Sequence, residues 1–417
     1  MKSSKENLIK TINHQQPDRI VVDFGSTAVT GIHVRVIEKL REYYGLAKIP
    51  VKVTEPYQML GEVGSDLLDA MDIDVVGLFG PKNMFGVPNE NWKVTRTLWG
   101  QEVMFPAEFN YTFTTNGDIL MYPEGDTAEP PSAMMPKTGF FFDALNRQEP
   151  IDDATLTVED NLQEFSPITR DDLAHWKKAV GGEKVKSKGV VASFGGTALG
   201  DIALVPAIHL KNPKGIRGVE EWYMSTLIRE DFVKEIFDRQ TDIAIENLKL
   251  LKQEVGDAVD VVFTCGTDFG TQNSTFCSPE TYDRVWKPYY RKVNDWIHAN
   301  TSWKTFKHSC GAVSNLLENF IDSGFDIINP VQINASGMDP VELKKKFGSR
   351  IVFWGGGVDT QGAFAFGSPS AVREQVKKQC DILNKDGGFV FNTVHNIQAN
   401  VPFENVVAML DALRELR

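Results

Sequence analysis

The chain has 417 residues, of which 42% are hydrophobic and 24% are charged, as in an ordinary globular protein. Its 44 basic and 56 acidic residues give a formal net charge of −12, which argues against nonspecific binding to nucleic acid. The sequence has no apolar stretch near the ~20 residues that span a membrane, and no signal-peptide core. Its four cysteines are too few for a disulfide framework, so we expect a cytoplasmic protein with reduced thiols.

Apolar, β-branched runs recur along the chain and alternate with segments of helical periodicity. The runs are apolar on both faces, which is typical of parallel strands buried on both sides. They predict eight strands, at 19–24, 73–79, 189–194, 259–264, 304–308, 325–329, 350–354 and 389–394.

Helix starts are marked in two places by serine followed by proline. Ser278 and Ser368 each combine an N-cap with a proline at the first helical position. We expect Pro288 to kink the first of these helices, because a proline inside a helix removes a backbone hydrogen bond. A last helix is predicted over 403–416.

Eight strands that alternate with helices predict an α/β protein, a single (β/α)₈ TIM barrel domain over residues 1–417. The stretch 88–150 breaks the pattern, and its Phe, Tyr, Thr, Gly and Pro content predicts a β-hairpin insertion at the barrel mouth. Its aromatic residues either wall a pocket for an aromatic ring or form ordinary core; they include Phe105, Tyr111 and Phe113. A small packed subdomain without substrate contact is the alternative.

A histidine and a cysteine two residues apart end the fifth predicted strand. Residues i and i+2 of a strand point to the same face, so His308 and Cys310 can converge on one ion. His395 follows the last predicted strand and is the candidate third ligand. Catalytic zinc takes three such protein ligands and keeps one position open. All three lie at carboxyl ends of strands, where barrel enzymes build their sites. A hydrogen-bonded histidine beside a buried thiol is the alternative.

Motifs spread over nearly the whole chain resemble the uroporphyrinogen decarboxylase superfamily, and within it the corrinoid-dependent methyltransferase branch. The resemblance implies a (β/α)₈ barrel, which agrees with the strand count. The motifs are PDRIVVDFG at 17–25, DFGTQ at 268–272, HSCG at 308–311, GGGVDTQ at 355–361, VHNIQ at 394–398 and VPFEN at 401–405.

Methylcobamide:thiol methyltransferases of this superfamily hold zinc with a His-x-Cys pair and a later cysteine. The pair matches His308 and Cys310, but His395 stands at the position of the later cysteine. Fewer thiolates make zinc a stronger Lewis acid, which suits a metal that polarises an ether oxygen. The resemblance therefore implies an O-demethylase methyltransferase, which moves a methyl group from an aryl methyl ether or another small methylated donor to the cobalt of a partner corrinoid protein.

The same hypothesis suggests further site residues. Asp268 is a candidate general acid or an orienter of a ligand histidine, or else a turn residue. Cys265 is a reserve ligand or an inert thiol, whereas Cys277 and Cys380 are expected to be structural. Asn396 and Gln398 hydrogen-bond the substrate or fix their loop. The glycines at 355–357 either bind a corrinoid tail or form a tight turn. Asp23 and His33, near the end of the first strand, are weaker candidate site residues.

Other functions remain open from the sequence. A methylcobamide:thiol methyltransferase is one alternative. Uroporphyrinogen decarboxylase itself is metal-free and binds its substrate through an arginine-rich motif, but the corresponding stretch 25–33 contains no arginine. A non-catalytic barrel that binds a tetrapyrrole is a third alternative function. The chain lacks an Asp-x-His-x-x-Gly corrinoid-binding motif, so the corrinoid would come from a partner. The resemblance also implies that a homodimer is possible.

Overall fold

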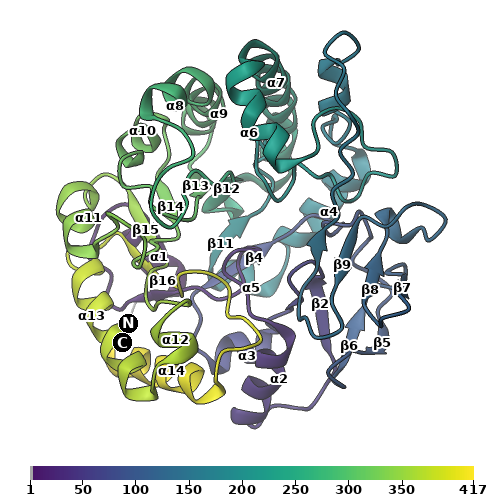
Figure 1. The fold of residues 1–417 in the computed structure, drawn as a ribbon. Helices are drawn as coiled ribbons and strands as arrows, with labels where there is room; N and C mark the ends of the chain where they lie inside the picture. Colours follow the sequence, from purple (N-terminus) through teal and green to yellow (C-terminus); the bar gives the residue numbers. More distant parts are fainter. Residues whose placement is uncertain (1–2) are drawn as a thin grey trace.

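The computed structural model describes residues 3–417. Eight strands form a ring with helices around it (Figure 1). All neighbouring strands in this sheet pair in parallel, so the predicted (β/α)₈ barrel is confirmed. Each strand overlaps its predicted range. Around the sheet the order is β1 (Val21–Val22), β16 (Phe389–Phe391), β15 (Val352–Trp354), β14 (Ile327–Asn329), β13 (Lys304–His308), β12 (Val261–Cys265), β11 (Gly189–Ala192) and β4 (Val75–Leu78).

Helices of 4 to 26 residues connect these strands. No helix among the described residues is long and apolar enough to cross a membrane. The helices are α1 (Ser4–Ile12), α2 (Val34–Tyr43), α3 (Ser65–Ala70), α4 (Arg170–Val180), α5 (Glu183–Ser187), α6 (Val219–Ile228), α7 (Glu230–Val255), α8 (Pro279–Val285), α9 (Lys287–Asn300), α10 (Leu317–Asp322), α11 (Pro340–Phe347), α12 (Ala363–Phe366), α13 (Pro369–Leu383) and α14 (Phe403–Leu416), with short 3₁₀ turns η1 (Pro123–Gly125), η2 (Val158–Asn161) and η3 (Gly256–Ala258).

The predicted helix boundaries are confirmed where the sequence carried a cap. The side chains of Ser278 and Ser368 accept hydrogen bonds from Thr281 N and Ala371 N at the starts of α8 and α13. The predicted kink at Pro288 is a break between two helices, since α8 ends at Val285 and α9 begins at Lys287. The last helix has the predicted bounds.

Helix α1 closes one end of the barrel. Its Leu8 and Ile12 pack against the inward-facing strand residues, which include Val21, Val191 and Phe306. Gly189, at the start of β11, has no room for a side chain, because a Cβ there would lie 2.1 Å from Leu8. With the amino-terminal end of the barrel filled by apolar side chains, the carboxyl end of the strands is left for polar chemistry.

The barrel closes at a seam between β1 and β4 that depends on one buried carboxylate. Asp74 N donates to Val22 O at 2.9 Å, and Val22 N donates to Asp74 Oδ2 at 3.0 Å. The same carboxylate, which is fully buried, accepts from Arg19 Nη2 at 2.5 Å and Arg417 Nη2 at 2.6 Å. Asp74 therefore joins the two edge strands and pairs with two cationic side chains.

The region expected to form hairpins holds two four-stranded sheets beside the barrel (Figure 1). The first sheet also recruits two strands from 51–61, outside the predicted range 88–150. Phe105 is buried and stacks on Phe109 at 4.4 Å, Tyr111 is half-buried and Phe113 is exposed. The first sheet comprises β3 (Leu60–Gly61), β2 (Val51–Glu55), β6 (Glu102–Phe105) and β5 (Lys93–Arg96), and the second β10 (Asp143–Ala144), β9 (Ala133–Met135), β8 (Ile119–Met121) and β7 (Tyr111–Phe113).

The seam gives a stability prediction. Asp74→Ala leaves the Arg19 and Arg417 guanidinium groups without their buried partner, and should lower the free energy of unfolding by about 3–5 kcal/mol in urea denaturation. The matched control is Asp72→Asn, because Asp72 pairs with the same two arginines but is 61% exposed, and asparagine is tolerated at its φ of +52°. It should cost less than about 1 kcal/mol. Equal losses in the two variants would contradict this role of Asp74.

Candidate metal centre

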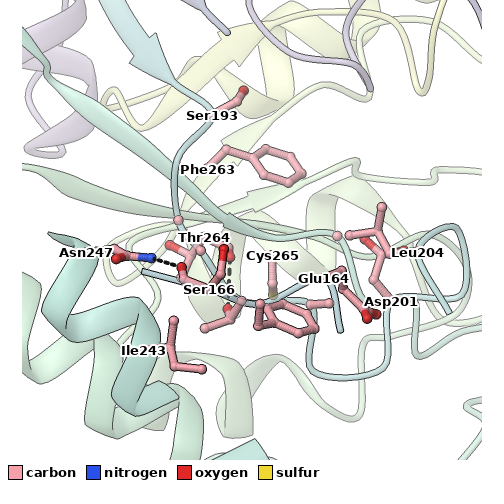
Figure 2. A pocket seen from close by; sticks show the side chains of 16 residues that line it. Glu164, Ser166, Ser193, Asp201, Leu204, Ile243, Asn247, Phe263, Thr264 and Cys265 are labelled. Carbon is pink, nitrogen blue, oxygen red and sulfur yellow. Dashed lines mark hydrogen bonds between the residues drawn. The ribbon is translucent and has the colours of Figure 1, made fainter. Parts of the chain in front are cut away.

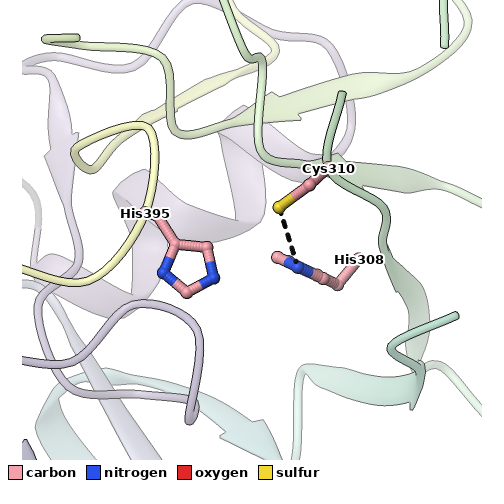
Figure 3. A group of neighbouring side chains, drawn as sticks. All are labelled: His308, Cys310 and His395. Atoms are coloured by element: carbon pink, nitrogen blue, oxygen red, sulfur yellow. Dashed lines mark hydrogen bonds between the residues drawn. The ribbon is translucent and has the colours of Figure 1, made fainter. Parts of the chain in front are cut away.

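Three predicted ligands meet at the carboxyl end of the barrel (Figure 3). His308 is the last residue of β13, Cys310 follows two residues later, and His395 lies in the loop after β16. Their ligand atoms all lie within 4.8 Å of one another. Alternation along β13 explains the direction of His308, since Phe306 two residues earlier belongs to the barrel interior.

A hydrogen bond to Asn329 orients the ring of His308. Nδ1 of His308 lies 2.7 Å from Asn329 Oδ1, and the Asn329 amide in turn donates to Trp354 O at 2.8 Å. The Asn329 oxygen thus faces the histidine as an acceptor, and Nδ1 carries the proton. The free Nε2 of His308 lies 3.4 Å from Cys310 Sγ. His395 lies edge-on to His308, with ring centroids 5.5 Å apart.

Burial sets the protonation of these groups. It lowers the pKa of His308 to about 4, and burial together with the neighbouring His308 lowers the pKa of His395 to about 4. Both imidazoles are therefore neutral at neutral pH and offer a lone pair. Burial and the carboxylates Asp268 and Asp201 raise the pKa of the Cys310 thiol well above its usual value. The thiol must lose its proton before it can bind a metal.

The donor set fits zinc. Two imidazole nitrogens and one thiol sulfur are typical zinc ligands, and three of them leave a fourth position open. Zinc–sulfur and zinc–nitrogen bonds of ~2.3 and ~2.0 Å at a tetrahedral angle hold the two atoms about 3.5 Å apart. The 3.4 Å between Cys310 Sγ and His308 Nε2 matches that spacing. The Asn329 contact to His308 is the supporting hydrogen bond that metal-binding histidines usually have.

Asp268 lies directly against the three ligands. Its Oδ1 accepts from Cys310 N at 2.6 Å and lies 3.7 Å from His308 Nε2. Burial raises its pKa. The prediction placed Asp268 near the metal either as a general acid or as an orienting residue, and the hydrogen bond to Cys310 N is of the orienting kind. Its catalytic role stays a prediction.

Besides Asn329, the structure adds two residues that the sequence analysis missed. Asp201 is buried beyond the end of β11, and burial together with Asp268 raises its pKa to about 7. Tyr223 of α6 stacks on Phe276 at 4.6 Å, and its buried hydroxyl finds no hydrogen-bond partner within residues 3–417. The glycine-rich stretch before Asp201 was the only available sequence signal, and Tyr223 had none because it comes from a distant helix.

Cys265, the reserve ligand, lies outside this group. It lines a separate cavity of about 350 Å³ at the ends of β11 and β12, together with Asp201 and Thr264 (Figure 2). Its sulfur accepts a hydrogen bond from Lys307 Nζ at 3.3 Å. Of the expected structural cysteines, Cys380 is buried and Cys277 is half-buried.

Asn396 ties loops together. Its Oδ1 accepts from Gly31 N at 2.5 Å, and its Nδ2 donates to Ala28 O at 2.8 Å and Gln58 Oε1 at 2.7 Å. These bonds correspond to the loop-fixing alternative. Gln398 is half-buried two residues further on, and substrate binding by either residue stays a prediction.

The weaker candidates have local partners. Asp23 is buried and accepts from Trp354 Nε1 at 2.9 Å, and burial raises its pKa to about 6. His33 caps α2, and its ring bonds to Phe140 O at 3.0 Å. Gly355 and Gly356 have φ angles of +98° and +85°, which fits a tight turn.

The fold and the site define the class of protein: a (β/α)₈ barrel with a two-histidine, one-cysteine cluster at its carboxyl end. The sequence family described as uroporphyrinogen decarboxylase (URO-D) matches residues 204–416, slightly more than half of the chain. The chain belongs to this family.

Two further comparisons bear on the fold. Among solved structures, a methyltransferase from Methanosarcina mazei is similar, with a TM-score of 0.54 over 100% of this chain and 99% of that one. The two sequences are 15% identical, so this likeness supports the barrel fold. A search of curated protein sequences gives no match.

The raised thiol pKa gives a reactivity prediction. In metal-free protein at about pH 7.5, iodoacetamide should label Cys310 at least about tenfold more slowly than free cysteine, because the thiolate is the nucleophile. Asp268→Asn removes a negative charge but keeps an oxygen for Cys310 N, and should speed the labelling. Mass spectrometry of the labelled peptides measures both rates.

Cys277 is the internal control. Burial alone raises its pKa to about 11, so its labelling rate should be the same in both proteins. A Cys310 rate equal to that of free cysteine would contradict the electrostatic account.

Proposed function

We propose that the protein is a zinc-dependent methyltransferase that moves a methyl group from a small methylated donor, an aryl methyl ether in the first instance, to the cobalt of a partner corrinoid protein. The observation that carries this proposal is the convergence of His308, Cys310 and His395, with Asn329 holding the first ligand. The methyltransferase from Methanosarcina mazei with the same fold favours this chemistry over others hosted by the family.

The ligand set favours an oxygen-linked donor. An ether is a poor electrophile because its leaving group is a high-energy phenoxide or alkoxide, and zinc supplies a Lewis acid for the charge that develops on that oxygen. The two histidines are neutral ligands, so His395 in place of a second thiolate leaves the centre more electrophilic. In the reaction the methyl carbon passes to cobalt(I), and the electron pair of the carbon–oxygen bond stays on oxygen.

Side chains of the protein can protonate the oxygen that loses its methyl group. That oxygen takes up a proton, and Asp268 and Asp201 are the nearby buried carboxyl groups with raised pKa values. Asp268, whose Oδ1 lies 3.7 Å from His308 Nε2, is the proposed donor of that proton, and Asp201 is the carboxyl group that interacts with it electrostatically.

The family name makes decarboxylation the second candidate, and the arginines argue against it. A tetrapyrrole with several carboxylates needs cations at the mouth, but the loop 25–33 has none. Arg41 pairs with Asp66 at 2.8 Å and donates to Ala47 O, and the guanidinium of Arg35 lies over the Phe140 ring at 4.8 Å. Both side chains are engaged away from the ligand cluster.

The proposal predicts about one zinc per chain in protein prepared without chelator. His308→Ala, Cys310→Ala and His395→Ala should each lose the metal, because each removes one of three ligands. Metal analysis of the purified variants measures this. Cys277→Ser is the control and should keep its zinc, since Cys277 lies outside the cluster. Zinc retained in His395→Ala alone would move the third ligand to Cys265 or Asp268, and a zinc-free wild type would contradict the proposal.

Activity is the second test. With a reduced corrinoid protein, the wild type should demethylate 2-methoxyphenol, followed through the absorbance of the corrinoid. Asp268→Asn should keep its zinc and lose about 10²-fold or more in turnover, the usual effect of removing a general acid. Methyl transfer from a methylated corrinoid to a thiol, without ether cleavage, would instead favour the methylcobamide:thiol alternative.

A further inference from the structure

A second cavity, of about 620 Å³, lies between the barrel seam and the first of the two additional sheets. We call it the seam chamber. Its barrel side is formed by Phe24, which follows β1, and by Val75 and Gly77 of β4. Leu60 of β3 and Trp92 line the opposite side. The chamber thus enters the barrel wall where β1 and β4 meet.

The absence of a side chain at Gly77 keeps the entrance to the seam chamber open. A Cβ on Gly77 would lie 2.3 Å from Ser26 O and 2.8 Å from the Phe79 ring. Any larger residue at position 77 would push the loop after β1 away from β4. Gly77 therefore allows the two strands to approach while leaving room beside them.

The walls of the seam chamber suit an aromatic ring. Apolar atoms form the larger part of its lining surface, and its volume lies within the range of small-molecule sites, roughly 300–1,000 Å³. The lining includes Phe24, Phe79, Met84 and Trp92. The cavity is far larger than a methylamine or methanol molecule, so a donor that fills it carries a bulky apolar group.

Ten polar or charged side chains also line the seam chamber, and the four lysine and glutamate side chains among them have partners. The carboxylate of Glu55 accepts from Tyr57 N at 2.9 Å and Gln58 N at 2.8 Å, and it can also accept from a hydroxyl of a ligand. Lys52 is paired with Glu62 at 3.3 Å and lies 5.5 Å from the Trp92 ring centre. Lys82, the second lysine of the lining, lies 4.0 Å from Glu124. Because both lysines already have an acidic partner, the chamber favours an uncharged ring.

The seam chamber is mechanically tied to the ligand loop. Ala28 and Gly31 line it, and both are held by the amide of Asn396, the residue after His395. Gln58, which contacts the same amide, donates its own Nε2 to Ala28 O at 3.2 Å. One short segment, 25–31, therefore connects the lining of the chamber to the loop that carries His395.

We infer that the seam chamber binds the aromatic ring of the methyl donor, an inference that rests on the proposed methyl transfer. The ring packs between Phe24 and Trp92, a ring hydroxyl donates to Glu55, and the methylated oxygen points toward the loop that carries His395. This assignment makes an aryl ether the substrate class and gives the additional sheet a role in substrate binding.

Gly80 offers a direct test. It lines the seam chamber, and a Cβ built on it meets no heavy atom within 4 Å. Its φ lies outside the left-handed region, so Gly80→Phe should fold normally while its ring occupies the cavity. We expect Gly80→Phe to weaken binding of 2-methoxyphenol by about tenfold or more, through the introduced steric clash. The melting temperature and zinc content should stay at wild-type values.

The binding measurement needs no metal. Quenching of tryptophan fluorescence by 2-methoxyphenol, in zinc-free and zinc-loaded protein, reports occupancy of the seam chamber. Trp92→Phe should lose most of the quenching, since Trp92 lines the cavity. Gly80→Ala is the matched control, because it adds a single methyl group at the same position and should bind within about twofold of the wild type.

The outcomes separate this inference from the proposed function. Equal affinity in Gly80→Phe and wild type would overturn the inference, as would a wild type that binds no aryl ether. The proposed function fails on different evidence, namely a wild type without zinc or without methyl transfer. A weakened Gly80→Phe in a protein without methyl transfer would still establish an aryl-binding chamber.

Discussion

The hydrogen bond between His308 Nδ1 and Asn329 Oδ1 is the contact on which the candidate metal centre depends. Asn329 is itself fixed by Trp354 O, so a chain of polar contacts runs across β13, β14 and β15. The contact sets the tautomer of His308, directs Nε2 toward Cys310, and holds the ring at the place where His395 approaches. It exists because parallel strands in register bring their carboxyl ends to one edge of the barrel.

The opposite face of β13 carries a buried cation, the ammonium group of Lys307. Lys307 points away from the barrel interior, is fully buried, and donates from Nζ to Thr267 O at 2.9 Å and His308 O at 3.2 Å. Four aromatic rings surround the ammonium group at 4.8–5.6 Å, among them those of Phe269 and Tyr290. Carbonyl oxygens and ring faces thus stabilise this charge. Its effect is to join the ends of β12 and β13, which carry Asp268 and His308.

The sequence predicted what depends on local pattern. Strands, capped helices and the break at Pro288 follow from periodicity and from cap residues, and the convergence of the three candidate ligands follows from spacing and strand ends. Asp201, Asn329 and Tyr223 were missed because their roles come from contacts with residues far away in the chain. The recruitment of 51–61 into the additional sheet was missed for the same reason, since the pairing of Val51 with Val103 is a long-range contact without a local signal.

The carboxylates beside the cluster have opposite effects with and without a cation. In the metal-free protein, Asp268 and Asp201 raise the pKa of Cys310 and so oppose formation of the thiolate. A dication bound by two neutral histidines and one thiolate leaves a net charge of +1, where one histidine and two thiolates would leave none. The same carboxylates, once ionised, then stabilise the centre. In the proposed centre, His395 in place of a second thiolate and the two neighbouring carboxyl groups are therefore two parts of one electrostatic arrangement.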